Sequence, residues 1–322
     1  MTAAATPPTG PASSGPTSRQ QAAPGALRSM AVGAFWFSVM TTLVKLAGRT
    51  LPPAEVVMAR AVFTLGFSWW GVRTLARPFG TERRLLLARG LLGAIALNCF
   101  FWSVTHLPLA VASVIQYTNP IVAALLAALL LGERLTARTV VAIATAVAGT
   151  VLVADPPWLT GASGPPLPPR GVAIALVGAV CSAAAYVTIR RIGARERPET
   201  VVLWLPLCTV PAMLPFVDGA TWRWPTPVEW LLLVGVSVAT QLAQLAMTRG
   251  LQGASAGRAT AVGTLQVAFA AVWGVAVFGE WPTWATVAGA ALIVGAAWLA
   301  ARPARQTRVA EAPAMQAITS SE

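Results

Sequence analysis

The sequence predicts an all-α integral membrane protein with ten transmembrane helices, arranged as two inverted five-helix repeats around a central cavity. Three observations lead to this prediction. The chain of 322 residues is 56% hydrophobic and has a mean hydropathy of +0.66. It contains ten long apolar segments, and its second half repeats a pattern of its first half at a nearly constant offset.

The composition indicates whether this chain is surrounded by water or by lipid. Only 11% of its residues are charged, whereas a water-soluble domain carries roughly a quarter. The chain is therefore expected to reside in lipid. Its three cysteines, Cys99, Cys181 and Cys208, lie in apolar runs without CxxC spacing, so the sequence indicates no disulfide framework, no metal site and no cofactor.

The ten apolar segments are each close to the length of about 20 residues that a membrane-spanning helix needs. Prolines fall between them, where a missing N–H group does little harm. The runs are too long for barrel strands, so helices are expected. The expected spans are residues 30–48, 54–74, 85–105, 108–131, 136–154, 170–190, 199–217, 227–248, 255–278 and 283–301.

Three polar segments flank or separate these spans. Residues 1–26 and 302–322 are expected to be disordered tails, since neither contains an apolar core. A Pro/Gly-rich linker at residues 155–169 separates a first five-helix repeat, residues 30–154, from a second, residues 170–301.

Basic residues are distributed unequally between the two sides of these spans. With the N-terminus inside, eighteen of the 23 Lys and Arg residues fall in cytoplasmic segments and four in opposite loops, with Arg60 inside a span. The cytoplasmic count includes Arg89, near the start of the third span. This bias places both termini in the cytoplasm of a multi-pass cell-membrane protein. It explains the net charge of +12 without a nucleic-acid partner.

An internal repeat relates the two halves. At an offset of 147, Gly132-Glu133 matches Gly279-Glu280, and the Thr-x-x-Thr-Val segment that begins at Thr136 matches the one at Thr283. Because each half has an odd number of spans, the second must cross the membrane in the opposite sense. Such inverted halves are typical of carriers that alternate between outward-open and inward-open states.

The segments HLPLAVASVIQYTNPIVAALLAALLLGERLTARTVVAIATAVAGTVLV and ATAVGTLQVAFAAVWGVAVFGEWPTWATVAGAALIVGA resemble the EamA repeat of the drug/metabolite transporter superfamily. The resemblance extends over about residues 30–301. It implies a ten-helix basket with a central cavity lined mainly by helices 1, 3, 4, 6, 8 and 9. It also implies movement of metabolites such as amino acids, nucleosides or their derivatives.

The fourth span contains an unusual polar stripe. Ser113, Gln116 and Asn119 recur at helical spacing and share one face, and the repeat offset relates Asn119 to Gln266 in the ninth span. An unpaired amide in hydrocarbon costs several kcal/mol, so these groups must face protein or water. They are expected to line a substrate cavity, with Pro120 letting the helix bend during gating. The alternative is that these amides hold helices together.

Further polar and aromatic side chains lie within other spans and could contact substrate. Packing and interface roles are the alternative for the aromatic rings. These candidate residues are Tyr117, Trp36, Asn98, Trp102, Tyr186, Gln241, Gln244 and Arg60.

Ionisable groups within the spans are few. Arg60 could hold an anionic substrate group, or it could play a structural part. Glu133 and Glu280 end the fourth and ninth spans, where they are expected to brace helix ends by pairing with an arginine. No acid lies near a span centre and the chain has one histidine, His106. Proton-coupled export of cationic drugs is therefore not favoured.

Together these features predict a secondary transporter that moves a small polar metabolite, with export favoured. An amide-lined channel and a non-transporting receptor or scaffold remain as alternatives. An enzyme is not expected, because no HExxH motif, acid pair or Ser-His arrangement lies within a span. Small residues of the last span, including Gly289 and Gly295, would suit a homodimer or packing within one subunit.

Overall fold

The computed structural model describes residues 25–107, 112, 115–154, 168–216, 224–279, 281 and 283–302. Most of the predicted tails and of the linker lie outside these residues, as do Ser113 and Glu280; Ala26, predicted to belong to the first tail, begins a helix. Every regular element within the described ranges is a helix. The helices are α1 (Ala26–Ala47), α2 (Pro53–Val72), α3 (Arg83–His106), α5 (Asn119–Leu131), α6 (Ala137–Ala154), α8 (Pro169–Ile192), α9 (Pro198–Met213), α10 (Pro227–Gly253), α11 (Ala256–Gly263), α12 (Leu265–Phe278) and α13 (Trp284–Ala301), with 3₁₀ turns at Gly193–Arg195 and Leu214–Phe216.

Five helical segments in the described residues are long and apolar enough to cross a membrane. They are Ala26–Ala47, Pro169–Arg195, Pro227–Gly253, Ala256–Phe278 and Trp284–Ala301. The helices α5, α6 and α9 are shorter but also apolar. Large apolar side chains such as Leu129, 80% exposed, and Val272, 62% exposed, point outward, as expected of a surface covered by lipid rather than water. The protein is therefore a multi-pass membrane protein.

Proline begins many of these helices. Pro53, Pro120, Pro169, Pro198 and Pro227 each occupy the first turn of a helix. At that position the absent N–H group would have had no partner within the helix, and the fixed φ angle favours helix initiation. Five boundaries of the bundle therefore follow directly from the positions of proline.

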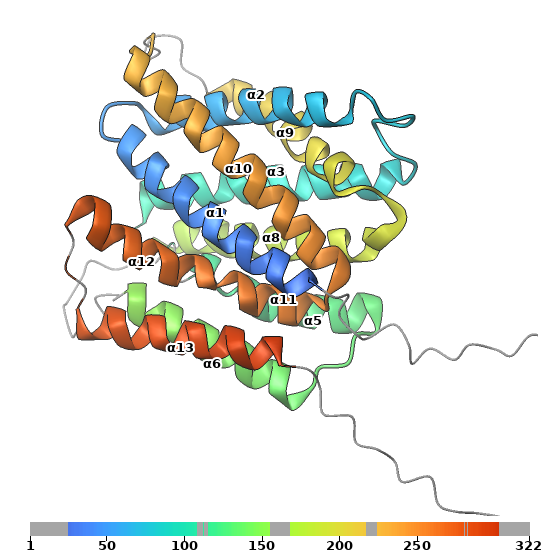
Figure 1. Ribbon diagram of the computed structural model, residues 1–322, viewed down its shortest axis with the longest axis vertical. Helices are drawn as coiled ribbons and strands as arrows, with labels where there is room; N and C mark the ends of the chain where they lie inside the picture. The colour runs from blue at the N-terminus through green and yellow to red at the C-terminus, as the bar shows by residue number, and fades with distance from the viewer. Residues whose placement is uncertain are drawn as a thin grey trace, which may run out of the picture.

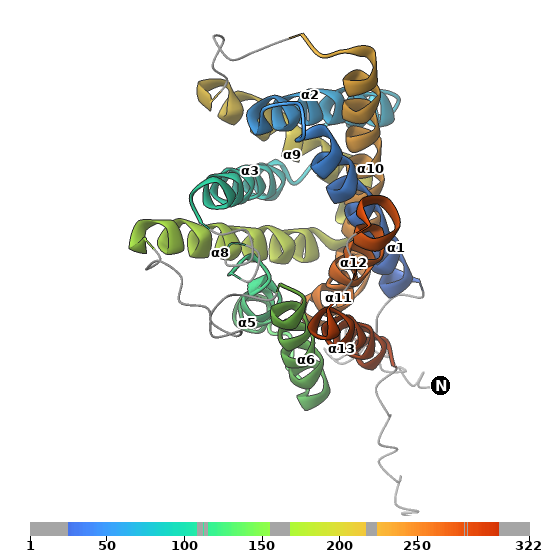
Figure 2. The same cartoon turned by 90° about the vertical axis from the view of Figure 1, so that its left-hand side faces the viewer.

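The helices stack along the long axis of the molecule (Figure 1). α2, α3 and α9 lie toward one end and α6 and α13 toward the other, with α1, α11 and α12 between them, while α10 runs from the first end toward the middle (Figures 1 and 2). Glycines allow the closest approaches. A β-carbon at Gly33 of α1 would lie 3.0 Å from the backbone nitrogen of Met247 in α10. One at Gly289 of α13 would lie 2.5 Å from the carbonyl oxygen of Gly149 in α6. Gly289 thus serves packing within one subunit.

One side of the molecule, at the right in Figure 1, contains the α2–α3, α5–α6, α8–α9 and α10–α11 connections. We call this side the basic face. Hydrogen bonds tie these connections together. Thr81 N donates to Glu196 Oε1 at 2.6 Å, Gln252 Nε2 donates to the Glu196 carbonyl at 3.0 Å, and Arg258 Nε donates to the Ala300 carbonyl at 2.7 Å. The start of α1 and the end of α13 lie on this same side (Figure 1).

Exposed tryptophans mark both ends of the bundle. Trp224, Trp281 and Trp284 are 79%, 87% and 80% exposed at the end opposite the basic face. Toward the basic face, an arginine stacks on each of two further tryptophans. The guanidinium carbon of Arg73 lies 3.4 Å from the ring centroid of Trp70, and that of Arg302 lies 3.3 Å from the ring centroid of Trp298. Such rings suit the border between hydrocarbon and headgroups.

Residues related by the offset of 147 adopt the same local geometry. Gly132 and Gly279 end α5 and α12, and both have a φ of 65°. The next helix in each half begins with the same contact between two threonine hydroxyls. It measures 2.9 Å for Thr136 and Thr139, and 3.0 Å for Thr283 and Thr286.

Candidate functional site

Two helices are interrupted inside the bundle. The prediction of one continuous fourth helix at 108–131 is wrong, because a turn at Tyr117–Thr118 precedes α5. The expected helix at 255–278 divides at Thr264 into α11 and α12. Pro120 explains the first interruption, since it cannot donate to the carbonyl four residues earlier. It therefore lies at the start of a helix rather than within one.

The two interruptions share a side-chain bond. The Thr118 hydroxyl donates to the Ile115 carbonyl at 2.7 Å, and the Thr264 hydroxyl donates to the Ala261 carbonyl at 2.7 Å. A hydroxyl that bonds the carbonyl three residues earlier competes with the helix ladder and helps to bend it. Both Thr118 and Thr264 keep right-handed helical angles, so each interruption is a short turn, here called a bend, rather than an unwound segment.

A cavity of about 50 Å³ lies between these bends. Five residues that the sequence analysis selected line it: Tyr117, Asn119, Pro120, Tyr186 and Gln266. The other lining residues, which were not predicted from the sequence, are Met30, Ala34, Phe37, Met247, Thr260, Gly263 and Thr264. The lining side chains come from both halves of the chain and carry no formal charge. The cavity therefore offers hydrogen bonds and aromatic contact but no counter-ion.

The polar groups of this cavity differ in whether they have a partner within the described part of the chain. Asn119 Nδ2 donates to Ser182 Oγ at 3.3 Å, which joins the start of α5 to α8. Among the described residues, the hydroxyls of Tyr117 and Tyr186 and the amide of Gln266 make no hydrogen bond. Groups of this kind can bind a ligand that enters when the cavity widens.

Gln241, Gln244 and Arg60 make bonds between helices instead of lining the cavity. Gln241 Oε1 accepts from the Ser68 hydroxyl at 3.1 Å, and Gln244 Oε1 accepts from Arg89 Nη2 at 3.2 Å. Arg60 Nη1 points at the sulfur of Met40 at 3.7 Å. These contacts connect α10 to α2 and α3, and α2 to α1.

The remaining candidates also lie away from the cavity lining. Asn98 Nδ2 donates to the Ala94 carbonyl of its own helix at 2.9 Å. Trp102 stacks on His106 with 3.9 Å between ring centroids, and Trp36 meets the neighbouring Phe35 edge-on at 5.6 Å. Gln116, which precedes the Tyr117–Thr118 turn, makes no side-chain hydrogen bond within the described residues.

Glu133 joins four helices at the basic face. Its Oε1 accepts from Arg190 Nε at 2.8 Å, and its Oε2 accepts from the Ala256 backbone N–H at 3.1 Å. Arg190 Nη1 also donates to the Gln252 carbonyl at 2.9 Å. The carboxylate thus caps the start of α11 while the ion pair connects the ends of α5 and α8. Its repeat counterpart Glu280 lies outside the described residues.

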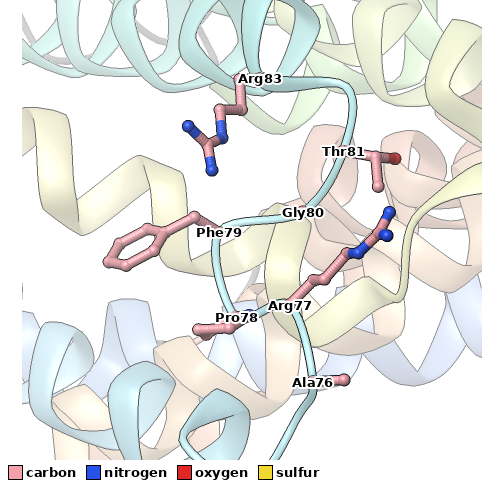
Figure 3. Close-up of a pocket in the computed structure, with 7 residues that line it drawn as sticks. All are labelled: Ala76, Arg77, Pro78, Phe79, Gly80, Thr81 and Arg83. Atoms are coloured by element: carbon pink, nitrogen blue, oxygen red, sulfur yellow. The ribbon is translucent and has the colours of Figure 1, made fainter.

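A second hollow, of about 450 Å³, lies on the α2–α3 connection at the basic face. Figure 3 shows Phe79 and Arg83 pointing to one side of it and Arg77 to the other. The pKa of the nearby Glu196 lies below its ordinary value. Burial alone would raise this pKa, but hydrogen bonds from Thr81 and Glu82 and the charge of Arg77 outweigh the effect of burial. The hollow is an open surface feature, separate from the central cavity.

The Glu196 carboxylate lies so close to Gly80 that it leaves no room for a side chain at this position. This glycine has a φ of +71°, and a β-carbon there would lie 2.7 Å from Glu196 Oε2. Glycine is therefore needed for both the backbone angle and the close approach.

Comparisons with known proteins agree with this architecture. The chain is 32% identical over 269 residues to the pseudopaline exporter CntI of Pseudomonas aeruginosa, covering 82% of this chain and 91% of that one. It is 27% identical over 261 residues to the riboflavin transporter of Vibrio cholerae, covering 80% and 82%. A solved crystal structure has the same fold, with a TM-score of 0.69 at 22% identity, covering 88% of this chain and 98% of that one.

The model of the EamA-like transporter family matches residues 26–154 and again residues 169–302. These two matches cover both halves of the chain and confirm the resemblance that the sequence motifs indicated. The chain belongs to the EamA-like transporter family.

Proposed function

We propose that this protein is a secondary transporter that moves a small polar metabolite across the cell membrane by alternating access. The main supporting observation is the pair of bends at Thr118 and Thr264, which flank a cavity lined by uncharged polar and aromatic side chains. Interrupted helices at corresponding positions of two repeats are the usual place for a transporter's substrate site.

In this proposal residues 30–154 and 170–301 are two five-helix repeats of opposite orientation, with both termini in the cytoplasm. The matching geometry at Gly132 and Gly279 supports the repeat, and the arginine-rich connections of the basic face support its cytoplasmic location. Export is the favoured direction, because a relative that matches 82% of the chain is an exporter.

The cavity is too small for a metabolite in this conformation. Ligand sites usually measure about 300 Å³ or more, several times the roughly 50 Å³ found here. Binding must therefore accompany a widening between the repeats. The contacts of Glu133 close the basic face, which supports a contracted state in which the cavity is not open to the cytoplasm.

Counterflow in proteoliposomes tests this proposal. A pooled library of amino acids, nucleosides and small organic acids is loaded inside, and accelerated uptake of the same labelled compounds is measured. Asn119→Ala and Gln266→Ala should lose exchange while retaining folded yield. Thr150→Ala, which alters a buried hydroxyl in α6 bonded to its own helix at 2.9 Å, serves as the matched control.

An amide-lined channel makes a different prediction for the same assay. A channel would let solute through without saturation and without acceleration by solute on the opposite side. A receptor or scaffold would bind without flux. Loss of folded yield in both cavity variants would instead show that the amides hold helices together.

A further inference from the structure

A guanidinium is buried inside the bundle without a counter-ion. Arg89 was counted with the cytoplasmic arginines near the start of the third span; it lies in the second turn of α3 and is only 2% exposed. Its Nη2 donates to Gln244 Oε1 at 3.2 Å, and its buried Nε makes no hydrogen bond. No carboxylate within the described ranges lies at ion-pair distance from it. Burial of an unpaired charge is costly, so a retained one within a membrane protein indicates function.

The side chain extends along α3 toward the later turns of this helix. A β-carbon at Gly93, one turn farther along α3, would collide with Arg89 Nη1 and would lie 2.6 Å from Leu205 Cδ1. Gly93 is ten residues into the 24-residue α3, which is about 15 Å along the helix axis from its start. Arginines near helix ends normally reach outward to the interface. Arg89 does the reverse, into space that the absent side chain of Gly93 leaves open.

The guanidinium is connected to the wall of the central cavity through its partner on α10. Its partner Gln244 is three residues before Met247 on the same face of α10, and Met247 lines the cavity. Tyr186, another lining residue, packs against the core cluster that contains Met247 and is within electrostatic range of Arg89. Widening the cavity along α10 would bring a bound molecule into contact with the free Nε.

We infer that Arg89 binds a carboxylate group of the transported molecule, an inference that rests on the transporter function proposed above. Nε and an adjacent Nη of a guanidinium form a planar fork that matches the two oxygens of a carboxylate. One guanidinium balances one negative charge, so a carboxylate leaves no net charge buried, whereas a phosphate dianion would. The uncharged cavity lining then contacts the rest of the molecule.

Matched pairs of ligands test this inference. Amino acids and small organic acids are each compared with the carboxamide of the same skeleton, by thermal stabilisation of the purified protein and by counterflow. The free acids should bind and the carboxamides should bind at least tenfold more weakly. In Arg89→Gln the preference should disappear, with a loss of about ten- to hundredfold in affinity for the acid, the range for hydrogen bonds to charged groups.

A second variant keeps the test decisive if Arg89→Gln does not fold. Gln244→Glu places a carboxylate next to the guanidinium and so occupies it internally. This variant should melt at or above the temperature of the parent and should no longer bind the acids. Arg84→Gln removes an exposed arginine of the same helix and should change neither property.

The outcomes separate this inference from the transporter function. If no acid stabilises the parent protein, or if Gln244→Glu binds acids as the parent does, the inference is overturned. Counterflow of a compound that is indifferent to its carboxylate overturns the inference and leaves the transporter function standing. Stabilisation by acids without counterflow supports the carboxylate site and overturns the transporter function.

Discussion

The ion pair of Glu133 and Arg190 is expected to hold the basic face closed. Glu133→Gln is the informative change, because the amide oxygen can still accept from the Ala256 N–H while the negative charge is lost. The two side chains are 14% and 20% exposed, so solvent screens the pair only partly. A hydrogen bond between charged groups contributes about 1.5–3 kcal/mol. A loss of about 2 kcal/mol would change the ratio of open to closed states roughly thirtyfold.

Cysteine labelling measures this change. A reporter cysteine replaces Thr260, which lines the cavity, and serine replaces the three native cysteines, Cys99, Cys181 and Cys208. A membrane-impermeant maleimide is then added to vesicles that expose the basic face. Glu133→Gln should raise the labelling rate by roughly thirtyfold, in proportion to the open population.

The matched control is Glu199→Gln. Glu199 pairs with Arg249 at 3.0 Å near the same face, but the two side chains are 30% and 54% exposed, so this pair should contribute little. Equal labelling rates in the two variants would refute the reasoning. A lower melting temperature of Glu133→Gln with unchanged labelling would show that the pair stabilises the fold without controlling access.

Two further predictions concern packing and pH. Gly289→Val should lower folded yield, measured by size-exclusion chromatography, with a cost of about 1–3 kcal/mol, because its β-carbon would lie 2.5 Å from the Gly149 carbonyl oxygen. Gly295→Val, with nothing within 4 Å of its β-carbon, should be neutral. The carboxylate of Glu196, whose pKa lies below the ordinary 4.5, should stabilise the fold above about pH 4.5 and lose this effect as pH falls through its lowered pKa. In a melting series from pH 6 to pH 3, Glu196→Gln should lose stability at the upper end and should show a flatter dependence; a slope equal to the parent's would contradict this.

Helix positions were largely predictable from the sequence, whereas the bends were not. Lipid requires every span to be a long apolar helix, so the apolar runs and the prolines located the helices to within a few residues. Pro120 was a visible signal for the first bend, although it was placed inside a helix. The second bend has no proline, and Thr264 in an apolar run looks like any helical threonine.

The unpredicted turn at Tyr117–Thr118 also changes the polar stripe that was expected on the fourth span. Asn119 and Gln266, which the repeat offset relates, both border the small cavity. Gln116 does not, because the predicted stripe assumed a continuous helix, and the turn at Tyr117–Thr118 separates it from Asn119. Arg89 could not be distinguished from an interfacial arginine, because the sequence contains no information on the direction in which its side chain extends.

The exposed tryptophans at the two ends of the bundle have a practical consequence. Trp224, Trp281 and Trp284 lie at one level and Trp70 and Trp298 at another, with their rings in the surrounding medium. Indole emission responds to quenchers carried at known depths on lipid chains. The chain has 13 tryptophans, so a variant that retains only one of these two groups would contain an internal depth marker, and its insertion in bilayers of different thickness could be followed by fluorescence without any attached dye.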